Sequence, residues 1–194
     1  MKLNLPYNFP YAIIIYIRFM GVFRKFFSIY CIIVFLVFML LLFPFVIFAS
    51  FFGKVKGGNM VYKICGLWAD LAFFFWGIGH RYIYEAPKLD TAVFIFNHIS
   101  YLDAAILVKA FRKRPVRVLG KAEMAHVPIF GFIYKNAVVM VNRSSPEARY
   151  QSLQLLKQIV RKGISIIIAP EGTFNVTHKP LKEFYNGAFE VAIE

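Results

Sequence analysis

The stretch that decides the fold class is residues 145–169, SPEARYQSLQLLKQIVRKGISIIIA. Its first part predicts a helix, because Ser145 is a favoured N-cap residue, Pro146 suits the first helical position, and the later leucines and isoleucines share one face. Gly163 is expected to end this helix. The run Ile164–Ile168 then predicts a strand buried on both faces, which is typical of a parallel sheet covered by helices.

The chain around this stretch continues the same alternation. Short β-branched, aliphatic or aromatic runs predict strands, and the segments between them predict helices or helical turns. Alternating strands and helices indicate an α/β domain with a mixed, mostly parallel sheet flanked by helices. The expected strands are residues 91–96, 116–119 and 137–141, and the expected helical segments are residues 101–111, 128–135 and 187–193.

A hydrophobic region precedes this domain. Residues 26–52 contain no Asp, Glu, Lys, Arg or His, and as one helix they would be about 40 Å long, against a hydrocarbon core of about 30 Å. Pro44 leaves two arrangements open, a tilted spanning helix or a re-entrant pair. Residues 61–79 predict a second, interfacial helix. We expect residues 1–80 to be membrane-associated and residues 81–194 to form the α/β domain.

The composition and charge also favour a bilayer partner. Hydrophobic residues make up 59% of the 194 residues, above the roughly 45–50% of soluble domains. The net charge is +13, and residues 1–60 hold six basic and no acidic residues, as expected beside anionic headgroups. No nucleic-acid-binding motif accompanies the basic residues. Cys31 and Cys65 lie in hydrophobic segments and form neither a disulfide framework nor a metal-binding pattern.

The segment Asn97-His98-Ile99-Ser100-Tyr101-Leu102-Asp103 carries the first candidate site. His98 follows a predicted strand, where active-site residues of α/β sheets are often found. A neutral imidazole can take a proton from a hydroxyl, and a carboxylate on its other nitrogen holds the tautomer. Ser100 and Asp103 also match a helix capping box. The segment therefore predicts a general base, a helix cap, or both, and the lack of a G-x-S-x-G sequence disfavours a serine hydrolase.

Two further groups follow later strands. Pro170-Glu171-Gly172-Thr173 comes directly after the predicted buried strand. The amides of such a turn can bind an anionic acceptor, although a plain turn has the same composition. Arg143 follows another strand, where its guanidinium could bind a phosphate bidentately or remain a solvated charge. Lys121 and the segment Val127–Gly131 lie between these groups.

Together these motifs give the chain a family resemblance. It resembles the bacterial glycerolipid acyltransferase family, typified by 1-acyl-sn-glycerol-3-phosphate acyltransferase and including other lysophospholipid acyltransferases. The resemblance covers roughly residues 80–194, and three blocks in order on an α/β background are highly specific. The matching residues are, in order, His98 and Asp103, then Lys121-Ala122-Glu123, Pro128-Ile129-Phe130-Gly131 and Arg143, then Pro170-Glu171-Gly172-Thr173.

The resemblance implies transfer of a fatty acyl group from acyl-CoA or acyl-carrier protein to the sn-2 hydroxyl of lysophosphatidic acid, in phospholipid biosynthesis. His98 would be the catalytic base and Asp103 would orient it. Lys121, Arg143 and the turn Glu171-Gly172-Thr173 would bind the glycerol phosphate. The resemblance implies no metal, no organic cofactor and no nucleic acid. It implies a location at the bacterial inner membrane, with the catalytic domain on the cytoplasmic side.

Two departures from the family pattern leave the acceptor open. Phe174 stands where the family has Arg, and Asn175 stands where Ser is common. The expected phosphate-binding cation is therefore missing, and Lys179 or Lys182 is a candidate to replace it. The alternatives are a non-phosphate acceptor, such as a lyso-amino-acid lipid, and an inactive membrane-anchored homologue. The sequence also ends at Glu194 within a predicted helix, before the family's fourth block, so we expect a truncated domain.

Overall fold

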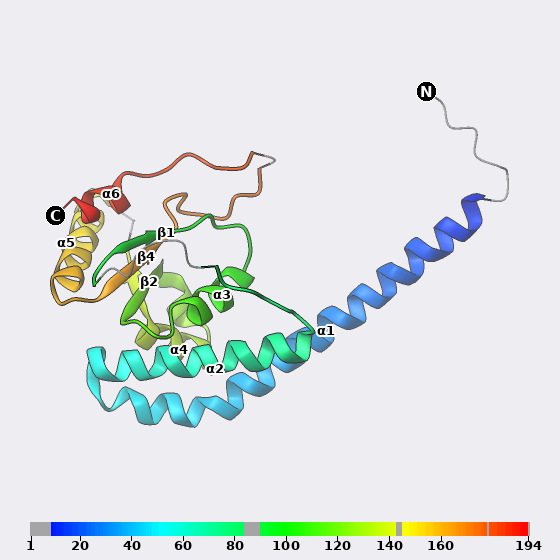
Figure 1. Ribbon diagram of the computed structural model, residues 1–194, viewed down its shortest axis with the longest axis horizontal. Coiled ribbons are helices and arrows are strands. Elements are labelled where there is room, and N and C mark those ends of the chain that lie inside the picture. The colour runs from blue at the N-terminus through cyan, green and yellow to red at the C-terminus, as the bar shows by residue number, and fades with distance from the viewer. Residues whose placement is uncertain (1–8, 84–89, 143–144, 178, 194) are drawn as a thin grey trace.

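A computed structural model describes residues 9–83, 90–142, 145–177 and 179–193. It comprises a long helical hairpin and a four-stranded sheet with helices on both faces (Figure 1). The strands are β1 (Val93–Ile95), β2 (Val116–Lys121), β3 (Val138–Val141) and β4 (Ser165–Ile168). The helices are α1 (Phe9–Ser50), α2 (Gly58–Trp76), α3 (Leu102–Ala110), α4 (Phe130–Ala137), α5 (Pro146–Arg161) and α6 (Gly187–Ala192), with shorter helical turns at Gly53–Gly57 and Ala122–His126.

The four described strands are all parallel and lie in the order β1-β4-β2-β3. β4 lies inside the sheet and all its residues are buried, which confirms the prediction for this run. Ile166 and Ile168 pack with residues of α5 and α6, whereas Ile167 packs on the other face with Tyr62 of α2 and Leu107 of α3. The α/β class is confirmed, and the carboxyl ends of all four strands meet at one edge.

The stretch that decides the fold class has the local structure that its sequence indicates. Ser145 is the N-cap of α5, and its hydroxyl accepts a hydrogen bond from the Ala148 amide at 3.1 Å. Pro146 occupies the first helical position, where no backbone N–H is needed. Gly163 has φ +74°, a left-handed conformation that glycine adopts without steric cost. These local features deliver the chain from α5 into β4.

The N-terminal hairpin differs from the prediction in its lengths. Helices were expected at residues 26–52 and 61–79, but α1 runs without a break from Phe9 to Ser50 and α2 covers Gly58–Trp76. Pro44 lies inside α1 and does not split it. The indole N–H groups of two α2 tryptophans donate to backbone carbonyls of α1, so the helices pack antiparallel.

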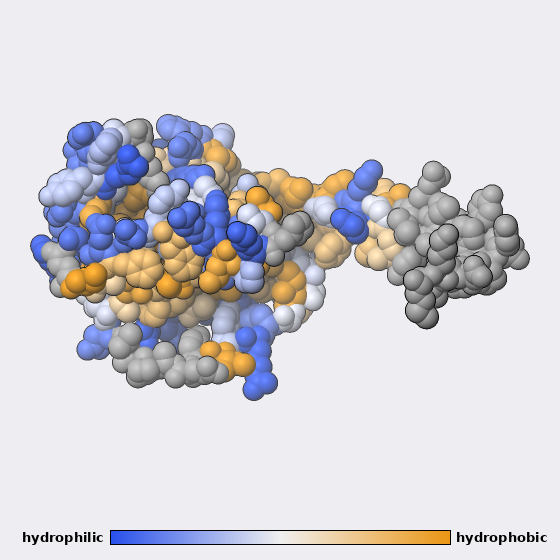
Figure 2. All heavy atoms as spheres, turned by 90° about the horizontal axis from the view of Figure 1, so that it is seen from above, coloured by the Kyte–Doolittle hydropathy of each residue, from blue (hydrophilic) through white to orange (hydrophobic). Residues whose placement is uncertain are grey.

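A large apolar surface remains on α1. The segment Met20–Ser50 is long and apolar enough to cross a bilayer, and only 17% of its most apolar window is buried. The N-terminal part of α1 projects beyond the sheet domain (Figure 1), and the part of this arm that is coloured in Figure 2, next to the sheet domain, is mostly hydrophobic. An exposed apolar surface of this kind indicates membrane association.

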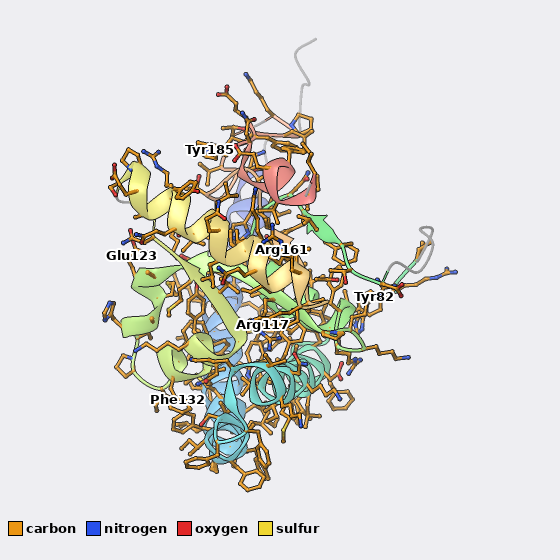
Figure 3. All side chains as sticks on the ribbon, turned by 90° about the vertical axis from the view of Figure 1, so that its left-hand side faces the viewer. Tyr82, Arg117, Glu123, Phe132, Arg161 and Tyr185 are labelled. Atoms are coloured by element: carbon orange, nitrogen blue, oxygen red, sulfur yellow. The ribbon has the colours of Figure 1, made fainter. Side chains whose placement is uncertain are left out.

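Two groups of polar contacts, one around Arg117 and one around Asp70, fix the hairpin to the sheet domain. The buried Arg117 side chain donates to Asn59 Oδ1 at 2.7 Å and to two backbone carbonyls of the turn between α1 and α2. Figure 3 shows it between the sheet and the hairpin. On α2, Asp70 pairs with the buried Lys109 ammonium at 2.6 Å and also with Arg112. These contacts position α2 and α3 relative to the strand ends.

Candidate active site

The candidate residues gather at the carboxyl edge of the sheet. His98 follows β1, Lys121 ends β2, and the turn 169–174 follows β4, which pairs with both strands. Parallel strands bring their carboxyl ends together, and all three strand ends contribute to the lining of one cavity. Arg143, which follows β3 in the sequence, lies outside the described residues.

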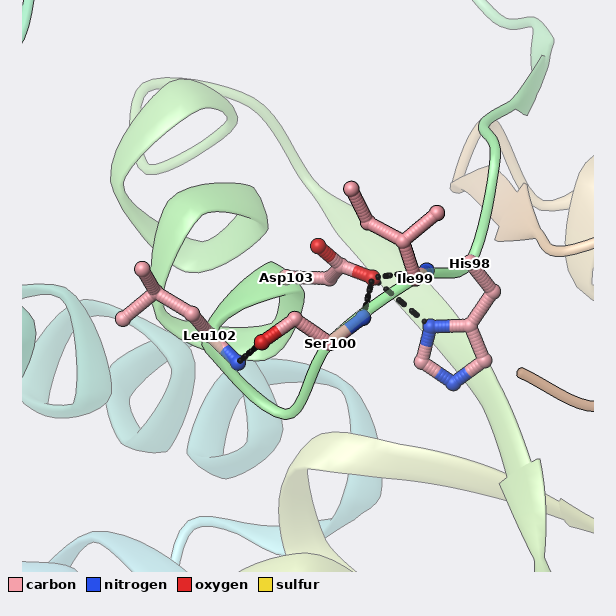
Figure 4. A network of polar contacts seen from close by, with 5 residues as sticks. All are labelled: His98, Ile99, Ser100, Leu102 and Asp103. Carbon is pink, nitrogen blue, oxygen red and sulfur yellow. Dashed lines mark hydrogen bonds and ion pairs between the residues drawn. The ribbon is translucent and has the colours of Figure 1, made fainter. Parts of the chain in front are cut away.

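The His98 imidazole is held by the Asp103 carboxylate. His98 Nδ1 lies 2.9 Å from Asp103 Oδ2, and the same oxygen accepts the Ile99 amide at 2.9 Å and the Ser100 amide at 3.0 Å (Figure 4). The His98 side chain is 29% exposed and that of Asp103 is 12% exposed. With Nδ1 bonded to the carboxylate, Nε2 is the nitrogen that can accept a proton from a substrate hydroxyl.

The capping-box contacts of Ser100 and Asp103 occur together with the histidine–carboxylate pair, although the N-cap residue of α3 itself is Tyr101. Ser100 Oγ accepts a hydrogen bond from the Leu102 amide at 3.1 Å, at the start of α3. The Asp103 carboxylate reaches back to the Ser100 amide, as in a capping box. The same carboxylate also bonds to His98. The two hypotheses from the sequence are therefore compatible in geometry, since the cap fixes the acid beside the imidazole.

The turn after β4 contains the other expected residues. Gly172 has φ +71°, which explains why a glycine is needed here. Thr173 Oγ1 accepts a hydrogen bond from Lys182 Nζ at 2.6 Å. Glu171 is fully buried, and neither of its carboxylate oxygens has a hydrogen-bond partner among the described residues. Gly172 and Thr173 line the cavity together with His98 and Lys121, whereas Glu171 is not part of that lining.

The turns after β1 and β4 contact each other directly. The backbone N–H of Asn175 donates a hydrogen bond to the backbone carbonyl of His98 at 2.6 Å. The Phe174 ring lies 4.2 Å from the His98 ring and 4.7 Å from the Tyr101 ring, measured between centroids. The two residues that depart from the family pattern, Phe174 and Asn175, are thus the ones that join the second turn to the candidate base.

The cavity extends from His98 into apolar surroundings. Its volume is about 390 Å³, within the range of pockets that bind small molecules or lipid chains. Met39 of α1, Trp68 of α2 and Tyr134 of α4 contribute to its walls. A Cβ at Gly120 would collide with the Tyr134 phenol, so the glycine lets Tyr134 lie across β2. Burial raises the pKa of Tyr134 to about 12, which keeps the phenol neutral.

Sequence reasoning did not assign the hairpin a part in this site. The hydrophobic pattern of residues 26–52 indicated a membrane anchor, yet Phe35, Met39, Leu42 and Val46 line the cavity. Cys65 also lines it, in keeping with its interpretation as an apolar filler. Hydropathy alone does not distinguish a lipid-facing side chain from one that faces a pocket.

The fold and the site together define a class of protein: membrane-associated α/β proteins with a histidine–carboxylate pair at the mouth of an apolar cavity. A family model for acyltransferases matches residues 80–194. Because this match covers more than half of the chain, the chain belongs to the acyltransferase family.

Several curated proteins are similar to this chain. It is 28% identical over 147 residues to a 1-acyl-sn-glycerol-3-phosphate acyltransferase from Cocos nucifera, a match that covers 74% of this chain and 46% of that protein. It is 33% identical over 112 residues to a probable 1-acyl-sn-glycerol-3-phosphate acyltransferase from Mycoplasma pneumoniae, covering 56% and 41%. It is 29% identical over 111 residues to a lyso-ornithine lipid O-acyltransferase from Pseudomonas aeruginosa, covering 57% and 41%.

The chain thus spans less than half the length of these three relatives. No solved structure matches it significantly.

Proposed function

We propose that this chain transfers a fatty acyl group from acyl-CoA or acyl-carrier protein to the sn-2 hydroxyl of lysophosphatidic acid. The observation that carries the proposal is the His98–Asp103 pair, 2.9 Å apart, at the mouth of an apolar cavity. Membership of the acyltransferase family supports the reaction type. The similarity to 1-acyl-sn-glycerol-3-phosphate acyltransferases supports the acceptor.

The reaction proceeds by direct transfer. His98 Nε2 takes the proton of the acceptor hydroxyl while the hydroxyl oxygen attacks the carbonyl carbon of the thioester. The carbon–sulfur bond breaks, and the thiolate leaves with the proton that the imidazolium returns. Asp103 holds Nδ1 and stabilises the imidazolium. This sequence of steps balances without a metal or an organic cofactor.

The apolar cavity provides a place for the acyl chain. Its walls come from α1, α2, α3, α4 and β2, and His98, Lys121 and Thr173 line it at the strand ends. An acyl chain lying between the helices would place its thioester carbonyl beside the imidazole. Attack on that carbonyl then occurs between groups that are already held in position. Lys121, Arg143 and the turn Glu171-Gly172-Thr173 would then position the acceptor, with Gly172 and Thr173 rather than the buried Glu171 facing the cavity.

The hairpin would keep this cavity beside the lipid. The exposed apolar surface of α1 supports insertion of the hairpin into a bilayer, from which a lyso-lipid can reach the strand ends. We propose that the membrane is the bacterial inner membrane and that the sheet domain lies on its cytoplasmic side, where acyl-CoA and acyl-carrier protein are available.

The proposal is tested by replacing the base. We expect His98→Ala to lower acyl transfer to lysophosphatidic acid by about 10²–10⁴-fold, measured with labelled acyl-CoA and protein in lipid vesicles. His126→Ala is the matched control, because His126 is exposed at the end of a helical turn. Both variants should still float with the vesicles. Full transfer by His98→Ala would refute the assigned base.

A second candidate function changes only the acceptor. Phe174 occupies the position where a cation was expected, and it contacts the His98 ring; a relative is named for acylation of lyso-ornithine lipid. Lysophosphatidic acid, lyso-ornithine lipid and monoacylglycerol compared at equal chain length would distinguish the candidates. Faster transfer to lyso-ornithine lipid than to lysophosphatidic acid would favour the second, and a lack of transfer to all three would favour an inactive homologue.

A further inference from the structure

The turn after β4 is accompanied by a lysine from a later part of the chain. Lys182 Nζ donates to Thr173 Oγ1 at 2.6 Å. Lys182 is half-buried, and no carboxylate of the described residues forms an ion pair with it. Its charge is therefore uncompensated in the described part of the chain, beside a turn whose residues line the cavity.

The loop that carries this lysine is attached on both sides. Asn175 Nδ2 donates to the Lys179 carbonyl at 3.1 Å, and Asn175 Oδ1 accepts the Thr177 amide at 3.0 Å. At the other end, the Tyr185 amide donates to the Pro170 carbonyl at 2.9 Å. Figure 3 shows Tyr185 on the segment that leads into α6. The chain thus returns to the turn from which it departed, and the fold places Lys182 over Thr173.

The chemistry of this pair suits a phosphate. A hydroxyl that accepts a hydrogen bond from an ammonium group keeps its own O–H for another acceptor, and the ammonium has further N–H donors. Hydrogen bonds from a charged donor to a phosphate oxygen are roughly twice as strong as neutral ones. A neutral partner such as Thr173 orients Lys182 without cancelling its charge.

The pair also lies close to the candidate base. Thr173 directly precedes Phe174, whose ring is 4.2 Å from that of His98, and His98 and Thr173 line the same cavity. In lysophosphatidic acid only a few bonds separate the phosphate from the sn-2 hydroxyl. An acceptor whose hydroxyl meets His98 Nε2 would therefore bring its phosphate to the turn that carries Lys182.

We propose that Lys182, oriented by Thr173, binds the phosphate of the acceptor and selects phosphate-bearing lyso-lipids. This inference rests on the proposed acyl transfer. It assigns the missing cation to a residue eight positions after Phe174. The phosphates of acyl-CoA have the same chemistry, so the experiment must separate acceptor from donor.

The test measures steady-state transfer in vesicles while lysophosphatidic acid and acyl-CoA are varied separately. We expect Lys182→Ala to raise KM for lysophosphatidic acid by about tenfold or more. The kcat, the KM for acyl-CoA and the rate with monoacylglycerol should stay within about twofold of the wild type. Lys182→Arg should retain most of the wild-type affinity. Lys179→Ala is the matched control, because the described hydrogen bonds of Lys179 use only its backbone carbonyl and backbone amide.

Three outcomes would overturn the inference: an unchanged KM for lysophosphatidic acid in Lys182→Ala, a rise confined to acyl-CoA, or an equal loss with monoacylglycerol. If Lys182→Ala does not fold, Lys182→Gln removes the charge while keeping a donor for Thr173. Equilibrium binding of lysophosphatidic acid without donor separates this inference from the proposed function. Weaker binding to Lys182→Ala would support the phosphate site even if the wild type transferred no acyl group.

Discussion

The segments that follow β1 and β4 lie side by side at the cavity, and each carries a carboxylate. The two carboxylates differ in how many hydrogen bonds they accept. Asp103 accepts three hydrogen bonds, from His98 and from two backbone amides. Glu171 is completely buried without a donor among the described residues. Three donors fix a carboxylate in place, whereas a buried carboxylate without donors lowers stability. The first turn is therefore held by its own residues, and the second depends on contacts from elsewhere.

Asp103→Asn tests the carboxylate that accepts the more hydrogen bonds of the two. We expect kcat to fall by about 10²–10⁴-fold, because an amide cannot replace the carboxylate that holds Nδ1 and stabilises the imidazolium. The measurement is acyl transfer in vesicles at saturating substrate. This is the largest effect expected from a change in either turn that leaves His98 itself in place.

Ser100→Ala is the control that separates the helix cap from the chemistry. It removes the hydrogen bond to the Leu102 amide and leaves the Asp103 contact to His98 in place. We expect it to lower the free energy of unfolding by about 1 kcal/mol, as loss of a cap does, and to change kcat by less than about tenfold. An equally large loss of activity in Ser100→Ala and Asp103→Asn would mean that the cap alone accounts for both.

Replacing the acid of each turn by its amide should change the free energy of unfolding in opposite directions. We expect Glu171→Gln to raise the free energy of unfolding by about 1–3 kcal/mol, because no described residue donates to this buried side chain and an amide costs less to bury than a carboxylate. Asp103→Asn should lower it by about 1 kcal/mol, because it weakens bonds to a charged acceptor. Thermal unfolding in detergent micelles measures both. A marked destabilisation by Glu171→Gln would contradict this expectation. It would show that the Glu171 carboxylate has hydrogen-bond donors in the folded protein.

The same contrast explains which parts of the site could be predicted from the sequence. His98, Ser100 and Asp103 lie within six residues, so their contacts follow from the start of one helix and a capping pattern. The contact between Lys182 and Thr173 closes a loop whose path the sequence does not encode in any short motif. The sequence indicated Lys179 and Lys182 equally, and only the folded loop distinguishes them.

The fold shows a similar division. The strand 165–168 and the helix before it were predictable, because cap, periodicity and glycine stop are local signals. The strand order β1-β4-β2-β3 could not be predicted from the sequence, because strand pairing depends on tertiary packing. The same is true of the hairpin: hydropathy identified an apolar helix, but Met39 and Val46 line the cavity while Phe45 and Phe48 are exposed. All four side chains are apolar, so hydropathy does not separate those that line the cavity from those that are exposed.

Phe174→Leu tests the ring contact between the two turns. We expect it to have the smallest effect on kcat of the catalytic variants. Phe174 contacts the rings of His98 and Tyr101, and such contacts are worth about 0.5–1.5 kcal/mol. We therefore expect kcat to fall by about two- to tenfold, because the imidazole loses a neighbour that positions it. Phe174→Tyr keeps the ring and should retain the wild-type kcat. If leucine matched phenylalanine in kcat, the aromatic contact would have no part in positioning the base, and among the described residues only the hydrogen bond from the Asn175 backbone amide to the His98 carbonyl would link the second turn to it.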